Sequence, residues 1–157
     1  FGQVSGHACD GYRCFAMRWS ATGLPTILGV LPGGPYAYGY AIYGARVVGA
    51  SMTSPTSGFQ GFQWTAGTGM TPVTGFDVIY GLSAKDRAVG FQRAPWGLPT
   101  QALTMRFTAP GVTTTLPALG FAISEARAVN RCGRIVGYST DFAWKKRAVI
   151  WQPPVCD

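Results

Sequence analysis

The sequence predicts an all-β fold, a propeller-like array of about four four-stranded antiparallel blades without significant helix. Three observations predict it. Two short runs recur with one common period of about 44 residues, glycine and proline separate short apolar runs along the chain, and no segment keeps a helical period. We expect a single β-repeat domain over residues 1–157, with repeats at approximately 1–34, 35–75, 76–119 and 120–157. Such a blade cannot bury both of its faces alone, so neighbouring copies must stack.

Two landmarks define the repeat. The first is a short run that closes in glycine, and its copies are spaced by 43, 41 and 47 residues, at Gly6, Gly49, Gly90 and Gly137. The second is a run that ends in an aromatic residue, and its copies are spaced by 45, 43 and 44 residues, at Trp19, Trp64, Phe107 and Trp151. Because the two landmarks are independent and share a period, we interpret them as equivalent strands of successive blades. We expect the four aromatic residues to pack between blades and to be buried at equivalent places.

Each repeat resolves into four short strands, a to d. Strand a is small and apolar, as in residues 79–82, and a tight polar turn leads to strand b, which closes in glycine. A longer loop precedes strand c, which ends in the aromatic residue, and a glycine turn precedes strand d, as in residues 112–116. The first repeat begins at strand b and the last stops after strand c. We therefore expect an incomplete unit that associates through its terminal blades, since open sheet edges invite pairing; a fragment of a larger propeller and a four-bladed domain remain alternatives.

Composition narrows the class of protein. Hydrophobic residues make up 47% of the chain and charged residues 12%, which excludes a disordered chain. No run approaches 18 consecutive apolar residues, so no transmembrane segment is expected. The net charge of +7 is dispersed, with one run at 145–147, and lysine is scarce. Nucleic acid is therefore not expected as a partner.

The four cysteines permit three pairings. Cys9 and Cys14 flank a short loop, and Cys132 and Cys156 lie in the last repeat, so proximity favours the disulfides Cys9–Cys14 and Cys132–Cys156. Disulfides imply an oxidising compartment. A zinc site is the alternative, but its spacing is unusual and His7 is the only imidazole.

The residues of common catalytic sites are missing. The six acids do not recur at one repeat position, and no nucleophile elbow, P-loop or dinucleotide fingerprint is present. We therefore expect a protein that is not an enzyme and that uses no cofactor or metal.

Candidate contact residues come from two sets. Arg46, Arg87 and Arg134 occupy the same place in strand b, so they should share one face of successive blades, either as a solvated polar face or as a set that recognises carboxylate, sulfate or phosphate. Trp96 and Trp144 lie in the variable b–c loops. An exposed tryptophan there can stack on a sugar ring or anchor a protein partner, and local loop packing is the alternative.

The runs together resemble the HAF repeat, a family of extracellular repeats whose pattern is roughly AYGIN-x-x-GQVVGYS, then HAF-x-W, then GMTDLG. The matching segments are 80–83, 133–139, 61–65 and 69–71, and the resemblance covers nearly the whole chain. The histidine of the family motif is absent, and Phe15, Gln60, Leu103 and Arg147 stand in its place. The resemblance implies export to an extracellular or periplasmic location and a β-repeat fold, and it brings no catalytic residues.

The function expected from these features is a non-catalytic extracellular interaction or scaffold module that is part of a larger surface assembly. Its partner would be another protein or a second copy of the chain. A propeller-type lectin that binds glycans through Trp96, Trp144 and the arginines is the alternative. Because the four b–c loops differ in length and composition, they favour protein contact over repeated sugar sites.

Overall fold

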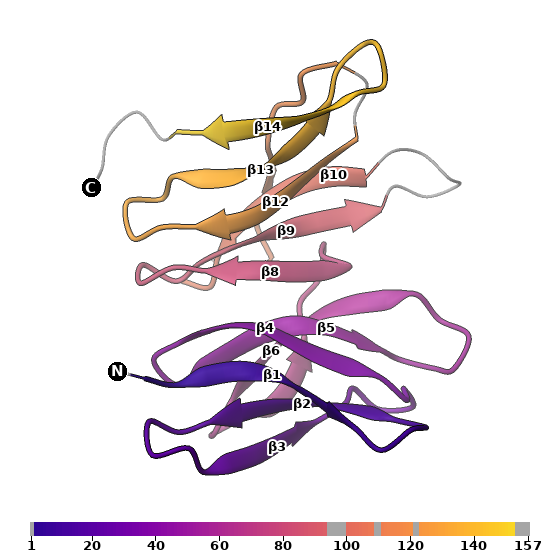
Figure 1. Ribbon diagram of the computed structural model, residues 1–157, viewed down its shortest axis with the longest axis vertical. Helices are drawn as coiled ribbons and strands as arrows, with labels where there is room; N and C mark the ends of the chain where they lie inside the picture. Colours follow the sequence, from indigo (N-terminus) through magenta and orange to yellow (C-terminus); the bar gives the residue numbers. More distant parts are fainter. Residues whose placement is uncertain (1, 94–99, 109–110, 121–122, 153–157) are drawn as a thin grey trace. The chain divides into compact units, whose positions relative to one another are not determined.

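The protein is built from β-strands and turns. The computed structural model describes residues 2–93, 100–108, 111–120 and 123–152. Within these ranges the chain forms fourteen strands and no helix, so the all-β prediction is confirmed (Figure 1). No helix that could cross a membrane occurs among those residues.

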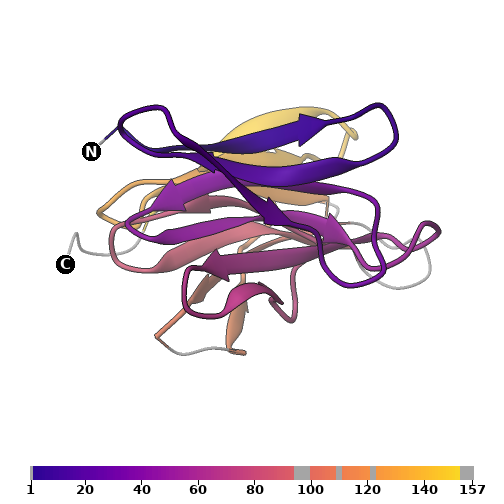
Figure 2. The same cartoon turned by 90° about the horizontal axis from the view of Figure 1, so that it is seen from below.

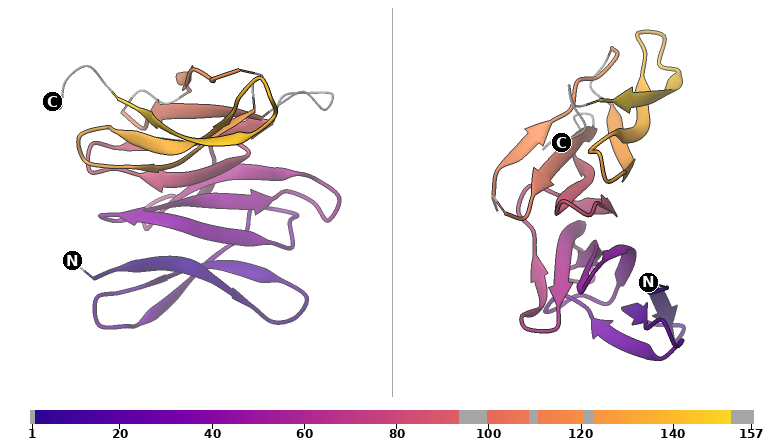
Figure 3. Two further views of the ribbon diagram at one scale, coloured as in Figure 1. Left: turned by 45° about the horizontal axis from the view of Figure 1, so that its top comes forward. Right: turned by 90° about the vertical axis from the view of Figure 1, so that its left-hand side faces the viewer.

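The strands form four antiparallel sheets, in each of which strands that follow one another in sequence are paired. Their hairpin turns can be followed from further sides in Figures 2 and 3. Sheet A contains β1 (Val4–Cys9), β2 (Cys14–Trp19) and β3 (Pro25–Gly29), and sheet B contains β4 (Ala37–Tyr43), β5 (Arg46–Met52), β6 (Phe59–Thr65) and β7 (Gly69–Pro72). Sheet C contains β8 (Val78–Leu82), β9 (Arg87–Arg93), β10 (Thr100–Arg106) and β11 (Thr113–Thr115), and sheet D contains β12 (Ser124–Val129), β13 (Ile135–Thr140) and β14 (Lys146–Trp151).

Sheets B and C each carry the expected strands a to d. Sheet A begins at strand b, and sheet D has strands a to c within the described residues.

The strand registers show which residues of the repeats are equivalent. In three sheets the residue two positions before the closing glycine lies opposite a tryptophan, in the pairs Val4–Trp19, Val47–Trp64 and Ile135–Trp151. In sheet C that residue is Ala88, and its partner is Met105. Phe107 follows the end of β10, so its assignment as the fourth landmark was wrong by two residues. The register follows the buried side chains of Leu103 and Met105, and an unbranched methionine can fill the space of an aromatic ring.

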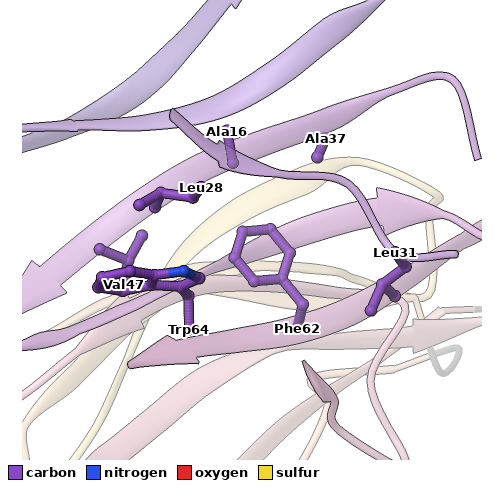
Figure 4. Packing of buried hydrophobic residues seen from close by; sticks show 7 residues of the cluster. All are labelled: Ala16, Leu28, Leu31, Ala37, Val47, Phe62 and Trp64. Carbon is purple, nitrogen blue, oxygen red and sulfur yellow. The ribbon is translucent and has the colours of Figure 1, made fainter. Parts of the chain in front are cut away.

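The chain divides into two compact units, residues 1–79 (unit 1) and 80–157 (unit 2). In unit 1, β2 and β3 of sheet A pack on sheet B around a cluster shown in Figure 4, which comprises Ala16, Leu28, Leu31, Ala37, Val47, Phe62 and Trp64. In unit 2, sheets C and D pack around Val89, Ala102, Ala126 and Ile135. Each large side chain fully buried in this way contributes roughly 1.5–3 kcal/mol.

A buried serine recurs two residues after the closing glycine. Ser51 accepts a hydrogen bond from the Leu31 N–H at 2.9 Å, and Ser139 accepts one from the Leu119 N–H at 3.0 Å. Both serines are fully buried. Each hydroxyl therefore fixes the segment that leads into its own sheet, and the satisfied polar group costs little to bury.

The aromatic landmarks differ in burial. Trp64 is 9% exposed between the two sheets of unit 1, whereas Trp19 and Trp151 are half-buried. The expectation of four equally buried landmarks was therefore wrong. Trp64 is covered by sheet A, while Trp19 lies on the opposite face of sheet A from that core.

The Cys9–Cys14 disulfide is confirmed and closes the β1–β2 hairpin. Asp10 shapes the loop, because its Oδ1 accepts hydrogen bonds from the Tyr12 and Arg13 N–H groups. These two sulfurs are bonded to each other, so the zinc alternative fails for them. The predicted Cys132–Cys156 disulfide involves Cys156, which lies outside the described residues.

Candidate binding surfaces

Sheet A presents an apolar outer face. Val4 lies opposite Trp19, and Met17 lies opposite both Gly6 and Ile27, so the side chains of these residues share the face that points away from the unit 1 core. Val4 is 56% exposed and Ile27 is 68% exposed. Met17 is buried and Trp19 is half-buried, so Val4 and Ile27 provide exposed apolar surface on this face. Exposed apolar surface on one face of a sheet is a feature of interaction surfaces.

The equivalent face of sheet B is covered by sheet A. The register makes Val47 and Trp64 the equivalents of Val4 and Trp19, and both are buried against Ala16 and Leu28 of sheet A. The outer face of sheet A is thus equivalent to the face of sheet B that a neighbouring sheet covers.

Sheet D presents a second outer face. Val136 and Ile150 lie opposite each other, and Ile150 is 62% exposed. Their sequence neighbours Ile135 and Trp151 point the other way, into the core of unit 2. This outer face of sheet D corresponds to the face of sheet C that packs on sheet D within unit 2, through residues of β9 and β10.

Trp144 lies in the β13–β14 turn and is 62% exposed. Its φ of 59° places a bulky residue in the left-handed region. The turn is held by Asp141, whose Oδ1 accepts from the Lys145 N–H and whose Oδ2 accepts from the Arg147 Nε at 2.8 Å. The Lys145 N–H and the Arg147 guanidinium lower the pKa of Asp141. Trp96, the other loop tryptophan, lies outside the described residues.

The three predicted arginines occupy equivalent positions but differ in surroundings. Arg46 is half-buried at the start of β5, and Arg134 is exposed just before β13. Arg87 starts β9 and lines a cavity of about 460 Å³ in unit 2. Within unit 2, Arg134 does not line that cavity, so a shared arginine site of Arg87 and Arg134 is not formed there.

Sequence reasoning missed two further residues of the cavity, Arg106 and Trp151. Arg106 pairs with Arg87 across the β9–β10 ladder, and both side chains line the cavity with Trp151. The two-residue error at Phe107 concealed this pairing, and Trp151 was assigned to inter-blade packing. The closing glycine does not fix this pairing either, because its partner in strand c lies 11, 13 and 12 residues further along the chain in sheets A, B and D.

No family model matches this chain, and no curated protein matches its sequence. The resemblance to the HAF repeat therefore rests on the motifs alone.

Proposed function

We propose that the chain is a non-catalytic extracellular interaction or scaffold module, built from propeller-type repeats of the HAF kind and acting within a larger surface assembly. Its sheets would stack as successive blades, and its outer faces would pack on a second copy of the chain. The observation that carries the proposal is the exposed face of sheet A around Val4 and Ile27, because the equivalent face of sheet B is buried under a neighbouring sheet.

Two further features support the proposal. The Cys9–Cys14 disulfide fits an oxidising, exported location. The Val136–Ile150 face of sheet D is equivalent to the faces that cover the next sheet within each unit. The outer face of sheet A of another copy would therefore pack on it.

Sedimentation velocity over a wide concentration range tests the proposal. We expect the wild-type chain to show a sedimentation coefficient that rises with concentration, and Ile27→Lys to remain monomeric, since a charge on an apolar face opposes burial. Tyr12→Lys is the matched control, because Tyr12 is exposed in the Cys9–Cys14 loop and off the face. A wild-type chain that stays monomeric, or an Ile27→Lys variant that associates normally, would contradict the proposal.

A glycan-binding lectin is the second candidate, and the exposed, left-handed Trp144 favours it. A glycan array probed with the wild-type chain and with Trp144→Ala tests it. Binding that disappears in the variant supports a lectin, and an array without bound glycans excludes sugar recognition at this residue.

A further inference from the structure

The cavity in unit 2 opens between sheets C and D, where β9 begins and β14 ends. Its residues come from both sheets and comprise Arg87, Thr104, Met105, Arg106, Leu116 and Trp151, together with Val112, Thr114, Gly133, Ile135 and Gln152. At about 460 Å³ it falls within the size range of small-molecule sites.

In unit 1 an arginine side chain lies over the equivalent tryptophan. There the guanidinium of Arg18 lies over the ring of Trp64, with Cζ 4.8 Å from the ring centroid. Registers make Trp151 the equivalent of Trp64 and Thr104 the equivalent of Arg18, because Thr104 precedes Met105 as Arg18 precedes Trp19. The short Thr104 leaves open in unit 2 the space that a stacked cation occupies in unit 1.

Positive charge surrounds the opening. Arg87 and Arg106 lie directly opposite each other on adjacent strands, and both line the cavity. No acidic residue is among those that line the described cavity, and unit 2 holds ten of the thirteen Lys and Arg residues but four of the six acids. An anion that enters between the two guanidinium groups would accept charge-assisted hydrogen bonds from both.

The interior favours an apolar body over a sugar. Leu116, Ile135 and Trp151 contribute apolar residues to the lining. Two of the polar groups are already engaged, because Thr104 Oγ1 donates to the Ala88 carbonyl at 3.1 Å and Trp151 Nε1 donates to the Pro117 carbonyl at 2.7 Å. Few donors remain for the hydroxyl groups of a sugar, whereas a flat ring can stack on the indole.

We propose that this cavity binds a small planar aromatic carboxylate. Its ring lies over Trp151, in the place that the Arg18 guanidinium takes over Trp64, and its carboxylate is held by Arg87 and Arg106. The site is separate from the outer faces of sheets A and D, so its failure would leave the proposed scaffold function untouched.

Isothermal titration calorimetry with 2-naphthoate as the probe tests the site. We expect saturable one-to-one binding that weakens as salt is added. The neutral analogue 2-naphthamide should bind about tenfold more weakly or worse, because it lacks the charge that the arginines recognise. Glucuronate, which keeps the carboxylate and lacks the aromatic body, should not bind measurably. Absence of naphthoate binding, or equal affinity for naphthoate and naphthamide, overturns the proposal.

Three variants locate the probe. Arg106→Gln, at an exposed position, should weaken naphthoate binding about tenfold. Thr104→Arg should abolish binding by rebuilding the stacked pair of unit 1 inside the cavity. Lys145→Gln is the control, since it removes one charge from an exposed turn residue of unit 2 that does not line the cavity, and it should bind as the wild type does. Thermal melting checks that each variant is folded. If Thr104→Arg does not fold, Arg106→Gln still decides: naphthoate affinity equal to that of the wild type overturns the site.

Discussion

At the scale of single residues, a recurring turn geometry shows where the backbone is strained. In these turns the N–H of the fourth residue donates to the carbonyl of the first, as Gly23 does to Ser20, Gly133 to Asn130 and Trp144 to Asp141. The fourth residue has a positive φ, which suits Gly23 and Gly133 and strains Trp144. Backbone strain at an exposed tryptophan is consistent with a role in contact.

Trp144→Gly should therefore stabilise the protein by about 1 kcal/mol, because glycine adopts the left-handed conformation without a clash. Urea denaturation measures the change. Trp144→Ala is the matched control, since alanine removes the indole but keeps the Cβ that causes the strain. Equal free energies of unfolding for the Gly and Ala variants would show that this residue stores no strain.

Tyr138 links stability to alkaline pH. Burial raises the pKa of Tyr138 to about 12, and its hydroxyl donates to Glu125 Oε1 at 2.6 Å. Because the folded pKa lies above the unfolded value of about 10, this stabilisation is complete below pH 10 and is lost as the pH rises to about 12. Tyr138→Phe should be less stable at neutral pH by about 1 kcal/mol and should lose less stability between those pH values.

Chemical denaturation at several pH values checks this linkage. Tyr12→Phe, in an exposed loop, is the control and should follow the wild-type pH profile. A wild-type profile that remains flat through the alkaline range would be inconsistent with a tyrosine kept neutral by its surroundings.

At the scale of elements, the β1–β2 hairpin combines a disulfide with a turn that Asp10 holds. The disulfide closes a short loop, with a sequence separation of 5. In the chain-entropy model a loop of that length contributes about 2 kcal/mol. Replacing both Cys9 and Cys14 by serine should lower the free energy of unfolding by about that amount, measured in urea. Asp10→Ala with the disulfide intact separates the contribution of the turn, and an unchanged stability in the double-serine variant would show that the hairpin holds itself closed.

Strand positions could be predicted from the sequence because each strand is punctuated by glycine, proline or Asx turns and because two landmarks recur. The register of the third repeat could not. An aromatic residue at position 107 matched the spacing, but pairing is decided by which of residues 102–106 face the core, and four of these five are buried. The cavity in unit 2 could not be predicted from the sequence either, because it depends on how Thr104 and Trp151, from different repeats, are placed relative to each other.

At the scale of the whole molecule, the two outer faces predict the geometry of assembly. The outer face of sheet A is equivalent to the face of sheet B that lies buried under sheet A. The outer face of sheet D is equivalent to the face of sheet C that covers sheet D. A contact between these unlike faces is heterologous, so it joins copies head to tail. Each contact would use the Ile27 side of one copy and the Ile150 side of another.

Ile27→Lys and Ile150→Lys should each abolish association when studied alone, because every contact needs both faces intact. Mixed in equal amounts, the two variants should form dimers and nothing larger, since the intact sheet D face of the Ile27→Lys chain meets the intact sheet A face of the Ile150→Lys chain. Sedimentation of the mixture against each variant alone measures this. A contact between two like faces behaves differently: if sheet A packed on sheet A, the Ile150→Lys variant would associate by itself, and mixing would add no new species.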